Sequence, residues 1–239
     1  MSMRTLGGNL LWHIRSHGIG GTLRYAMERV IESGYEWHLG VNTRTAVSLA
    51  TFGIRDPEMQ DYHPIPYSGL HAALRTCPID PATDVFFDYG VGKGRAVLLA
   101  ARWPFRRVEG IELATSLVVV ARGNVAKALR RLQCCDIRVH VADATSYPLP
   151  DDVTIVHFYN PFRGSTLHAV AKQIAQSLQR NPRHLTILFA YPDDFERVLA
   201  DTGATLGTLV RQRRELRWRL SPDEKLGRLY TAYSLSSAD

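Results

Sequence analysis

The segment Asp88-Tyr89-Gly90-Val91-Gly92-Lys93-Gly94 begins within the end of a short β-rich run, 84–89, and leads into a helical run, 95–102. Its three alternating glycines allow the backbone to turn sharply and to approach a ligand closely, because glycine has no Cβ. A strand that passes through such a turn into a helix is typical of ligand sites in parallel α/β sheets. The segment therefore predicts an open, mostly parallel sheet with a ligand at the carboxyl end of its first strand.

Strands and helices alternate along the rest of the chain. Further strands are expected at 108–112, 137–142, 153–158 and 184–191, with helices over 116–132 and 167–178 and from residue 193 onward. Two more strand-like stretches, 205–213 and 226–235, close the chain. This alternation predicts an α/β domain over residues 81–239, with a mostly parallel seven-stranded sheet and helices on both faces.

Residues 1–80 have a different pattern and are predicted to form an N-terminal helical extension. Apolar residues recur at helical spacing in 6–14 and 23–31, and three glycines, Gly18, Gly20 and Gly21, separate the two runs. A third helix is expected over 45–52 and a fourth from Ser68. Residues 62–67 should be extended, because a residue before proline avoids the helical region. The extension would serve as a lid over the site or as a partner-binding surface.

The composition is that of a globular protein, with 45% hydrophobic and 22% charged residues among 239. The net charge of +6 permits an anionic partner, but the basic residues are not interleaved with aromatic ones, which argues against nucleic acid. No apolar run reaches the roughly 18 residues of a membrane span. The cysteines, Cys77, Cys134 and Cys135, lack metal-ligand spacing. We therefore expect reduced thiols, no metal site and a cytoplasmic protein, and no oligomeric state is predicted.

Polar side chains follow the ends of four successive predicted strands. Asp88 opens the glycine turn, Glu112 ends the second strand, Asp143 follows the third, and Asn160-Pro161-Phe162 follows the fourth. Each has an ordinary alternative: a tight turn at the glycines, a helix cap at Glu112, an Asx turn at Asp143 and a turn before proline at Asn160. Because ligands bind beyond the carboxyl ends of such strands, the set favours one binding site.

A dinucleotide is the main alternative ligand. That fingerprint has a glycine at the sixth position of the turn, where it allows close packing of helix on strand. Counted from Gly90, the sixth position is Arg95, and the third glycine comes one residue earlier, at Gly94. This spacing disfavours a dinucleotide.

The order Asp88-x-Gly90-x-Gly92-x-Gly94, then Glu112, then Ala142-Asp143-Ala144 resembles the cofactor motifs of the Rossmann-like, class I S-adenosylmethionine-dependent methyltransferases. The resemblance implies that the glycine turn holds the methionine moiety, with Asp88 near its ammonium group. It implies that Glu112 binds the ribose hydroxyls and that Asp143, beside Ala144, meets the adenine amino group. S-adenosylmethionine is therefore the expected cofactor.

A narrower resemblance concerns the segments that flank the site. Tyr62-x-Pro64, the glycine turn and Asn160-Pro161-Phe162 together look like the non-SET histone lysine methyltransferases and their bacterial relatives. This implies that the loop carrying Tyr62 folds over the cofactor. The Asn-Pro-Phe segment is also similar to the Asn-Pro-Pro-aromatic motif of amino-group methyltransferases that act on adenine, cytosine or glutamine.

The methyl acceptor needs a lone pair and a group that orients it. Asn160 is the expected orienting residue, through its side-chain carbonyl. His157 is a candidate base, although its position also fits burial beneath a helix, and His63 is a second candidate. The expected walls of the acceptor site are aromatic: Tyr67, Tyr159 and Phe162.

Three functions remain open at this point. The first is a transferase that methylates an O or N acceptor of a small metabolite or secondary product. The second is a protein (lysine-type) or nucleic-acid methyltransferase, and the third is a catalytically silent protein that binds the cofactor.

Overall fold

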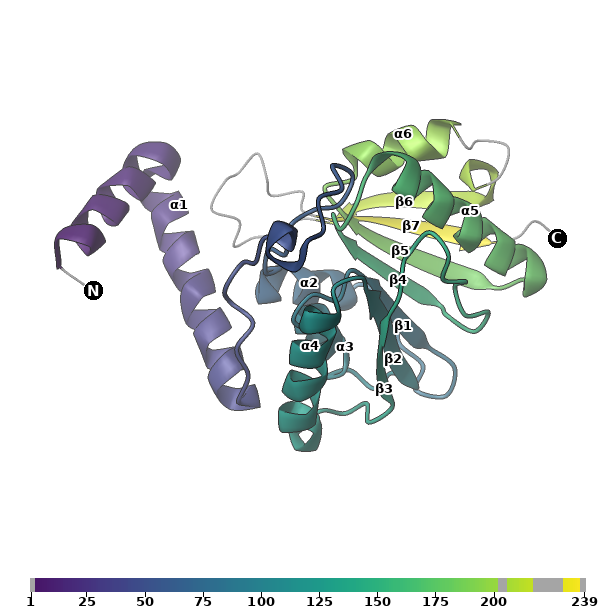
Figure 1. Cartoon of the computed structure of the whole chain (residues 1–239), viewed down its shortest axis with the longest axis horizontal. Helices are drawn as coiled ribbons and strands as arrows, with labels where there is room; N and C mark the ends of the chain where they lie inside the picture. Colours follow the sequence, from purple (N-terminus) through teal and green to yellow (C-terminus); the bar gives the residue numbers. More distant parts are fainter. Residues whose placement is uncertain (1–2, 202–205, 217–229, 237–239) are drawn as a thin grey trace.

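The computed structural model describes residues 3–201, 206–216 and 230–236, with side chains from residue 14 onward. Its centre is a seven-stranded sheet with the order β3-β2-β1-β4-β5-β7-β6 (Figure 1). The sheet is Rossmann-like and mostly parallel, as the sequence predicts, because β7 alone among the described strands reverses direction. The strands are β1 (Val85–Tyr89), β2 (Arg107–Glu112), β3 (Ile137–Val141), β4 (Ile155–Tyr159), β5 (His184–Ala190), β6 (Val210–Leu216) and β7 (Tyr230–Ser236).

The strand order reverses between β1 and β4. The chain runs outward from β1 through β2 to β3, then returns to place β4 on the other side of β1. The connections that leave β1 and β4 therefore diverge at their carboxyl ends and open a crevice between them. This is the edge of the sheet to which the predicted site residues belong.

Helices cover both faces of the sheet (Figure 1). One face is covered by α2 (Tyr67–Leu74), α3 (Arg95–Ala100) and α4 (Thr115–Ala128), and the other by α5 (Gly164–Arg180) and α6 (Asp193–Asp201). Successive strand residues point to opposite faces, so Phe86 packs in the core under α2 and α3 and Phe87 packs in the core under α5. Leu70 and Leu74 of α2 belong to the first of these cores, so this part of the extension packs as part of the sheet domain.

The N-terminal helix α1 (Met3–Leu39) projects from the sheet domain (Figure 1). It is interrupted at Gly18, which has φ 68° and ψ 177°, so the expected pair of helices forms with a kink between them. The helix expected over 45–52 is wrong: only a short 3-10 helix, η1 (Leu49–Phe52), forms, and Gly53 ends it with φ 78°. A glycine tolerates this left-handed conformation, which an ordinary residue rarely adopts.

The C-terminal strands differ from their predicted bounds. A 3-10 turn, η3 (Gly207–Leu209), replaces the start of the strand expected over 205–213, so β6 begins only at Val210. A Cβ on Gly207 would lie 2.5 Å from the carbonyl oxygen of Leu199, so this turn packs against α6. The last predicted strand, 226–235, is observed from Tyr230, and residues 226–229 lie outside the described part.

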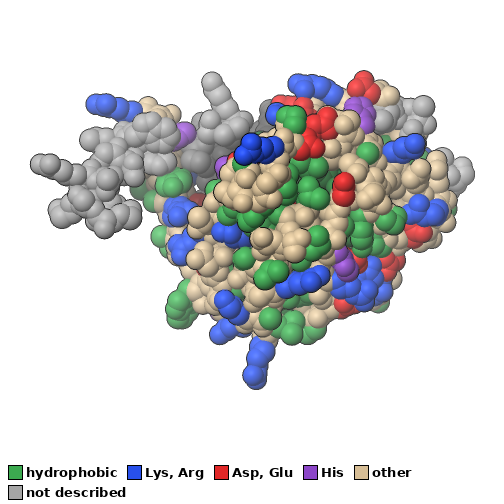
Figure 2. Space-filling view, in the orientation of Figure 1, with side chains coloured by type: hydrophobic (Ala, Val, Ile, Leu, Met, Phe, Trp, Pro, Cys, Tyr) green, Lys and Arg blue, Asp and Glu red, His purple; other side chains and the backbone are tan. Residues whose placement is uncertain are grey.

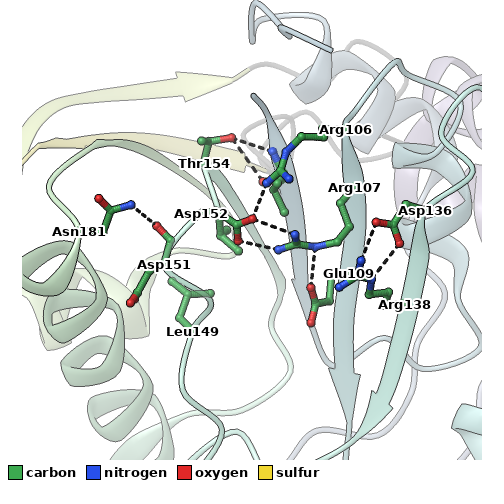
Figure 3. A network of polar contacts seen from close by, with 12 residues as sticks. Arg106, Arg107, Glu109, Asp136, Arg138, Leu149, Asp151, Asp152, Thr154 and Asn181 are labelled. Carbon is green, nitrogen blue, oxygen red and sulfur yellow. Dashed lines mark hydrogen bonds and ion pairs between the residues drawn. The ribbon is translucent and has the colours of Figure 1, made fainter. Parts of the chain in front are cut away.

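Ion pairs hold the opposite, amino-terminal end of the sheet (Figure 3). The Arg107 guanidinium at the start of β2 donates to both carboxylate oxygens of Asp152, at 2.6 and 2.8 Å, and to Glu109 at 2.8 Å. Arg138 on β3 pairs with Asp136 at 2.8 Å. These contacts tie β2 to the loop before β4 at the end remote from the crevice.

Within the described ranges, no helix is long and apolar enough to cross a membrane. The same residues contain no group of three side chains arranged to hold a metal ion.

The Arg95 cluster joins the extension to the sheet domain. Arg95 is the first residue of α3 and is only 1% exposed. Its guanidinium donates to Glu32 at 2.7 Å and Glu36 at 3.2 Å, both on α1. It also donates to the Thr43 hydroxyl at 2.7 Å and to the Ile65 carbonyl at 2.9 Å. One buried cation therefore fixes α1, the segment after it and the loop before α2.

Replacing Arg95 with alanine would leave the carboxylates of Glu32 and Glu36 buried without their main partner. Breaking a buried ion pair in this way costs about 3–5 kcal/mol. We expect urea unfolding of Arg95→Ala to show a loss of that size in the free energy of unfolding. Arg106→Ala is the control, because the Arg106 side chain is 40% exposed and pairs with an exposed carboxylate, so its loss should cost below about 1 kcal/mol. Equal stability of the two variants would contradict this role of Arg95.

Candidate functional site

A cavity lies at the carboxyl ends of β1 to β4, at the crevice where the strand order reverses. The segment between η1 and α2 forms another wall, through Met59 to His63 and Ile65. Nine of the predicted site residues line it: Tyr62, Asp88, Gly90, Glu112, Asp143, Ala144, Tyr159, Asn160 and Phe162. His157 also borders it, with no exposed surface, whereas Gly92, Gly94 and Tyr67 do not.

Three carboxylates follow one wall of the cavity in the order of the strands. Asp88 lies in β1, Glu112 ends the neighbouring β2, and Asp143 follows β3, the next strand along. Neighbouring strands are about 4.8 Å apart, so three adjacent strand ends span roughly 10 Å. The wall therefore presents acceptor groups to a ligand that is elongated and carries several donors.

Glu112 is 8% exposed and bridges two backbone segments. One carboxylate oxygen accepts from the Gly92 N–H at 2.9 Å, and the other accepts from the Ala114 N–H, also at 2.9 Å, just before α4. Burial raises the pKa of Glu112 above its usual value, and these backbone donors oppose the rise. Glu112 thus acts as a helix cap, the ordinary alternative, and each oxygen still has a lone pair for a ligand.

Asp143 closes a local turn at the rim of the cavity. Its Oδ1 accepts from the Thr145 N–H at 2.8 Å and from the Thr145 hydroxyl at 2.7 Å. None of the described residues hydrogen-bonds its other oxygen. Asp143 is therefore an Asx-turn residue that keeps one carboxylate oxygen for a ligand.

The glycine turn is covered by protein side chains. Gly90, Gly92 and Gly94 have φ of 79°, 56° and 89°, in the left-handed region. A Cβ on Gly92 would lie 2.2 Å from the ring of Tyr62, and one on Gly90 would lie 2.6 Å from Pro161. The glycines thus allow the two flanking segments to close over the turn. The Tyr62 hydroxyl donates to the Thr43 carbonyl at 2.8 Å, which orients its ring.

Asp88 and His157 form a buried polar pair across β1 and β4. His157 Nδ1 is 2.6 Å from Asp88 Oδ1, and His157 Nε2 is 2.7 Å from the hydroxyl of Tyr230 on β7. Burial raises the pKa of Asp88, and the adjacent His157 opposes this rise. Both ring nitrogens of His157 are engaged within the protein, so neither is offered to an acceptor in the cavity. The geometry thus fits the alternative of burial, with His157 as a partner of Asp88, and a role as the base stays a prediction.

The end of β4 forms an aromatic wall with one amide. Asn160 has φ 47°, a left-handed conformation that asparagine tolerates better than most residues. In the described part of the chain no group hydrogen-bonds its side-chain amide. The Tyr159 and Tyr191 rings lie 5.9 Å apart, and Tyr191 also has a positive φ, 55°. Unusual backbone conformations beside a cavity are common at functional sites.

One predicted residue lies outside the cavity, and one residue of the cavity had no predicted role. Tyr67 was expected to line the acceptor site, but it is fully buried at the start of α2. Its ring stacks on Tyr35 at 4.8 Å and lies under the Arg95 guanidinium at 4.6 Å, so it belongs to the Arg95 cluster. Arg95 itself lines the cavity and had no predicted role. Its position directly after the glycine turn, where the dinucleotide pattern has glycine, is the feature of the sequence that could have indicated a role for Arg95.

The segment 58–62 is held against the segment that follows β4. The Gln60 N–H donates to the Pro161 carbonyl at 3.0 Å, and the Arg163 N–H to the Glu58 carbonyl at 2.9 Å. The Glu58 carboxylate accepts from the N–H groups of Ser165 and Thr166, both at 2.8 Å, and so caps α5 from a distant part of the chain. Gly164 permits this approach, since a Cβ there would lie 2.3 Å from Glu58 Oε1.

Comparison with known proteins agrees with the fold. No protein-family model and no curated protein matches the sequence. The methyltransferase domain of bacterial CtHen1 superposes with a TM-score of 0.51 at 12% identity, over 72% of this chain and all of that one. A TehB-like S-adenosylmethionine-dependent methyltransferase from Corynebacterium glutamicum superposes with a TM-score of 0.49 at 15% identity, over 89% of this chain and 99% of that one. An RNA methyltransferase from Salinibacter ruber, in complex with S-adenosyl-L-homocysteine, superposes with a TM-score of 0.45 at 18% identity, over 72% of this chain and 92% of that one. The likeness to CtHen1 supports the Rossmann-like methyltransferase fold.

The Glu58 contact should depend on pH. Hydrogen bonds from the backbone of Ser165 and Thr166 lower the pKa of Glu58 from 4.5 to about 2. A lowered pKa means that the contact is fully formed above pH 4.5 and is lost as the pH falls through about 2. We expect the amide NMR signals of Ser165 and Thr166 to titrate with a midpoint near pH 2. Glu58→Gln, which cannot titrate at this position, is the control; a midpoint near 4.5 would show that Glu58 does not cap α5.

Proposed function

We propose that this protein is an S-adenosylmethionine-dependent methyltransferase that acts on an O or N acceptor of a small molecule. The observation that carries the proposal is the row of Asp88, Glu112 and Asp143 along one wall of a single cavity. The cofactor has three donor groups in the same order, namely the ammonium group, the ribose hydroxyls and the adenine amino group. A protein (lysine-type) or nucleic-acid acceptor is the alternative.

The donor set of the cavity fits this cofactor. Asp88 has one carboxylate oxygen on His157, and no described residue hydrogen-bonds the other, which suits an ammonium group. Glu112 and Asp143 retain lone pairs for hydroxyl and amino donors. The cavity is also lined by the apolar side chains of Ile111, Leu117 and Phe162, as an adenine ring requires.

The chain's own contribution to the reaction is to position the reactants and exclude water. When bound, S-adenosylmethionine supplies a methyl group activated by a positive sulfonium. Tyr62, held by Thr43, and Pro161 cover the glycine turn and limit access of water from that side. The Asn160 carbonyl accepts a hydrogen bond from the acceptor amine or hydroxyl and aims its lone pair. Such alignment is worth up to roughly 7–11 kcal/mol.

A small acceptor is favoured by the way the cavity is closed. The segment 58–62 contributes to the lining of the cavity and is hydrogen-bonded to the residues after β4. Tyr159, Asn160 and Phe162 form another part of the wall. Figure 2 shows Lys and Arg side chains spread over the face drawn, without a continuous basic surface for nucleic acid. His157 has no exposed surface and both of its ring nitrogens are engaged, so its role is to orient the Asp88 carboxylate.

The first test is cofactor binding by calorimetry. S-adenosylhomocysteine should bind, and Glu112→Ala should weaken binding at least tenfold, because each lost hydrogen bond leaves a buried group unpaired at about 1–3 kcal/mol. Asp194→Ala, which removes an acid of α6 paired with Arg197, should bind normally. Circular dichroism checks that Glu112→Ala is folded. Binding of a nicotinamide dinucleotide and none of S-adenosylhomocysteine would overturn the proposal.

The second test addresses the acceptor. Asn160→Gly removes the amide while keeping a residue that tolerates φ 47°. It should retain cofactor affinity and lose turnover, because the lost contact is made with the aligned acceptor. His157→Gln should instead weaken cofactor binding through Asp88, with both limbs of the pH profile retained. Normal turnover of Asn160→Gly would remove Asn160 from the orienting role, with His63 the next candidate. Loss of one limb in His157→Gln would instead show that His157 acts as the base.

A further inference from the structure

The helix α1 turns its acidic side toward the protein and its apolar side toward solvent, the reverse of an ordinary surface helix. The side that faces the protein carries three buried acids, Glu28, Glu32 and Glu36, at 5%, 5% and 3% exposure. Glu28 accepts hydrogen bonds from the Ser68 hydroxyl and N–H at the start of α2, and the other two bind Arg95. The side that faces solvent carries large apolar residues: Ile19, Leu23, Met27, Val30 and Trp37, at 70%, 61%, 54%, 72% and 86% exposure.

These five residues form one continuous surface, the outer stripe of α1. They follow one another at intervals of four, four and three residues, and then of seven, with Gly34 between Val30 and Trp37. Residues at this spacing lie above one another on the same side of a helix. The outer stripe contains no charged residue. A contiguous apolar surface of this kind on a folded protein marks an interaction site.

The charges beside the outer stripe have one sign. The chain has no Asp or Glu before residue 28 and carries Arg4, Arg15 and Arg24 in that stretch. All three acids of α1 are turned inward, whereas Arg15, Arg29 and His38 are exposed. Arg29 pairs with Glu32, yet its side chain remains 47% exposed. The accessible surface of α1 from residue 14 onward is therefore apolar and basic.

We propose that the outer stripe of α1 binds the surface of an anionic lipid bilayer, with the helix lying in the interfacial plane. An apolar stripe bordered by basic residues is the pattern of helices that bind such surfaces. Trp37, at one end of the stripe, is a residue type enriched at the membrane–water interface. A second copy of the chain fits less well, because pairing two outer stripes would bring the basic flanks together. The helix α1 projects from the sheet domain (Figure 1), and every residue of the outer stripe is at least 54% exposed.

Sedimentation of the full-length protein with vesicles tests this proposal. We expect binding to vesicles of phosphatidylcholine with phosphatidylglycerol and at least tenfold weaker binding to phosphatidylcholine alone. The double variant Leu23→Gln, Val30→Gln should reduce binding to the anionic vesicles at least tenfold. These residues are 61% and 72% exposed, so the fold should be retained. Val119→Gln on α4, which alters a 64% exposed valine elsewhere, should bind as the wild type does.

Tryptophan fluorescence provides a second measurement at the stripe itself. Anionic vesicles should shift the emission of the wild type to shorter wavelength, and Trp37→Phe should lose most of that shift while still sedimenting with vesicles. Sedimentation that is equal for the wild type and the Leu23→Gln, Val30→Gln variant would overturn the proposal. The proposal would also be overturned if the wild type did not bind vesicles and light scattering showed that it is a dimer, whereas this variant is a monomer. Both results are independent of cofactor binding, so they leave the proposed function untouched.

Discussion

The buried Arg95 guanidinium is the interaction on which the arrangement of this molecule most depends. It follows the glycine turn directly and reaches Glu32, Glu36, Thr43 and Ile65, which come from three parts of the N-terminal extension. A charge buried to 1% exposure is stable only with partners of opposite sign close by. The extension must therefore dock where its acids meet Arg95, and docking places its loop over the cavity. The same requirement turns the acids of α1 inward and its apolar residues outward.

The cavity follows from this docking and from the topology of the sheet. The reversal of strand order opens the crevice, and the strand ends supply the carboxylates. The extension supplies the cover, since Tyr62 lies on Gly92 and Glu58 caps α5. Arginine in place of the glycine of a dinucleotide turn thus has a physical reason: Arg95, at the start of the helix after the turn, anchors the N-terminal extension. The sheet domain that forms the cavity and the segment that covers it are thus joined by one buried cation.

The sheet and the acids could be predicted from the sequence because both depend on local patterns. Alternating apolar runs mark each strand, and the position of a strand end locates Asp88, Glu112 and Asp143. Contacts between distant segments leave no such pattern. Nothing local to Glu58 indicates that it caps a helix more than a hundred residues later, or that Tyr230 completes the partners of His157. The predicted location of Tyr67 differs from the observed one for the same reason, because its neighbour Arg95 is close only in the folded chain. The start of β6 was misplaced because the turn before it packs against α6.

The most direct test of this account is a crystal structure of the protein with S-adenosylhomocysteine. The account predicts the ligand in the cavity at the carboxyl ends of β1 to β3, with its ammonium group at Asp88, its ribose hydroxyls at Glu112 and its adenine amino group at Asp143. Tyr62 should remain over the glycine turn, with the Arg95 cluster intact. A ligand bound away from the three acids, or a cavity that stays without ligand at saturating concentration, would contradict it.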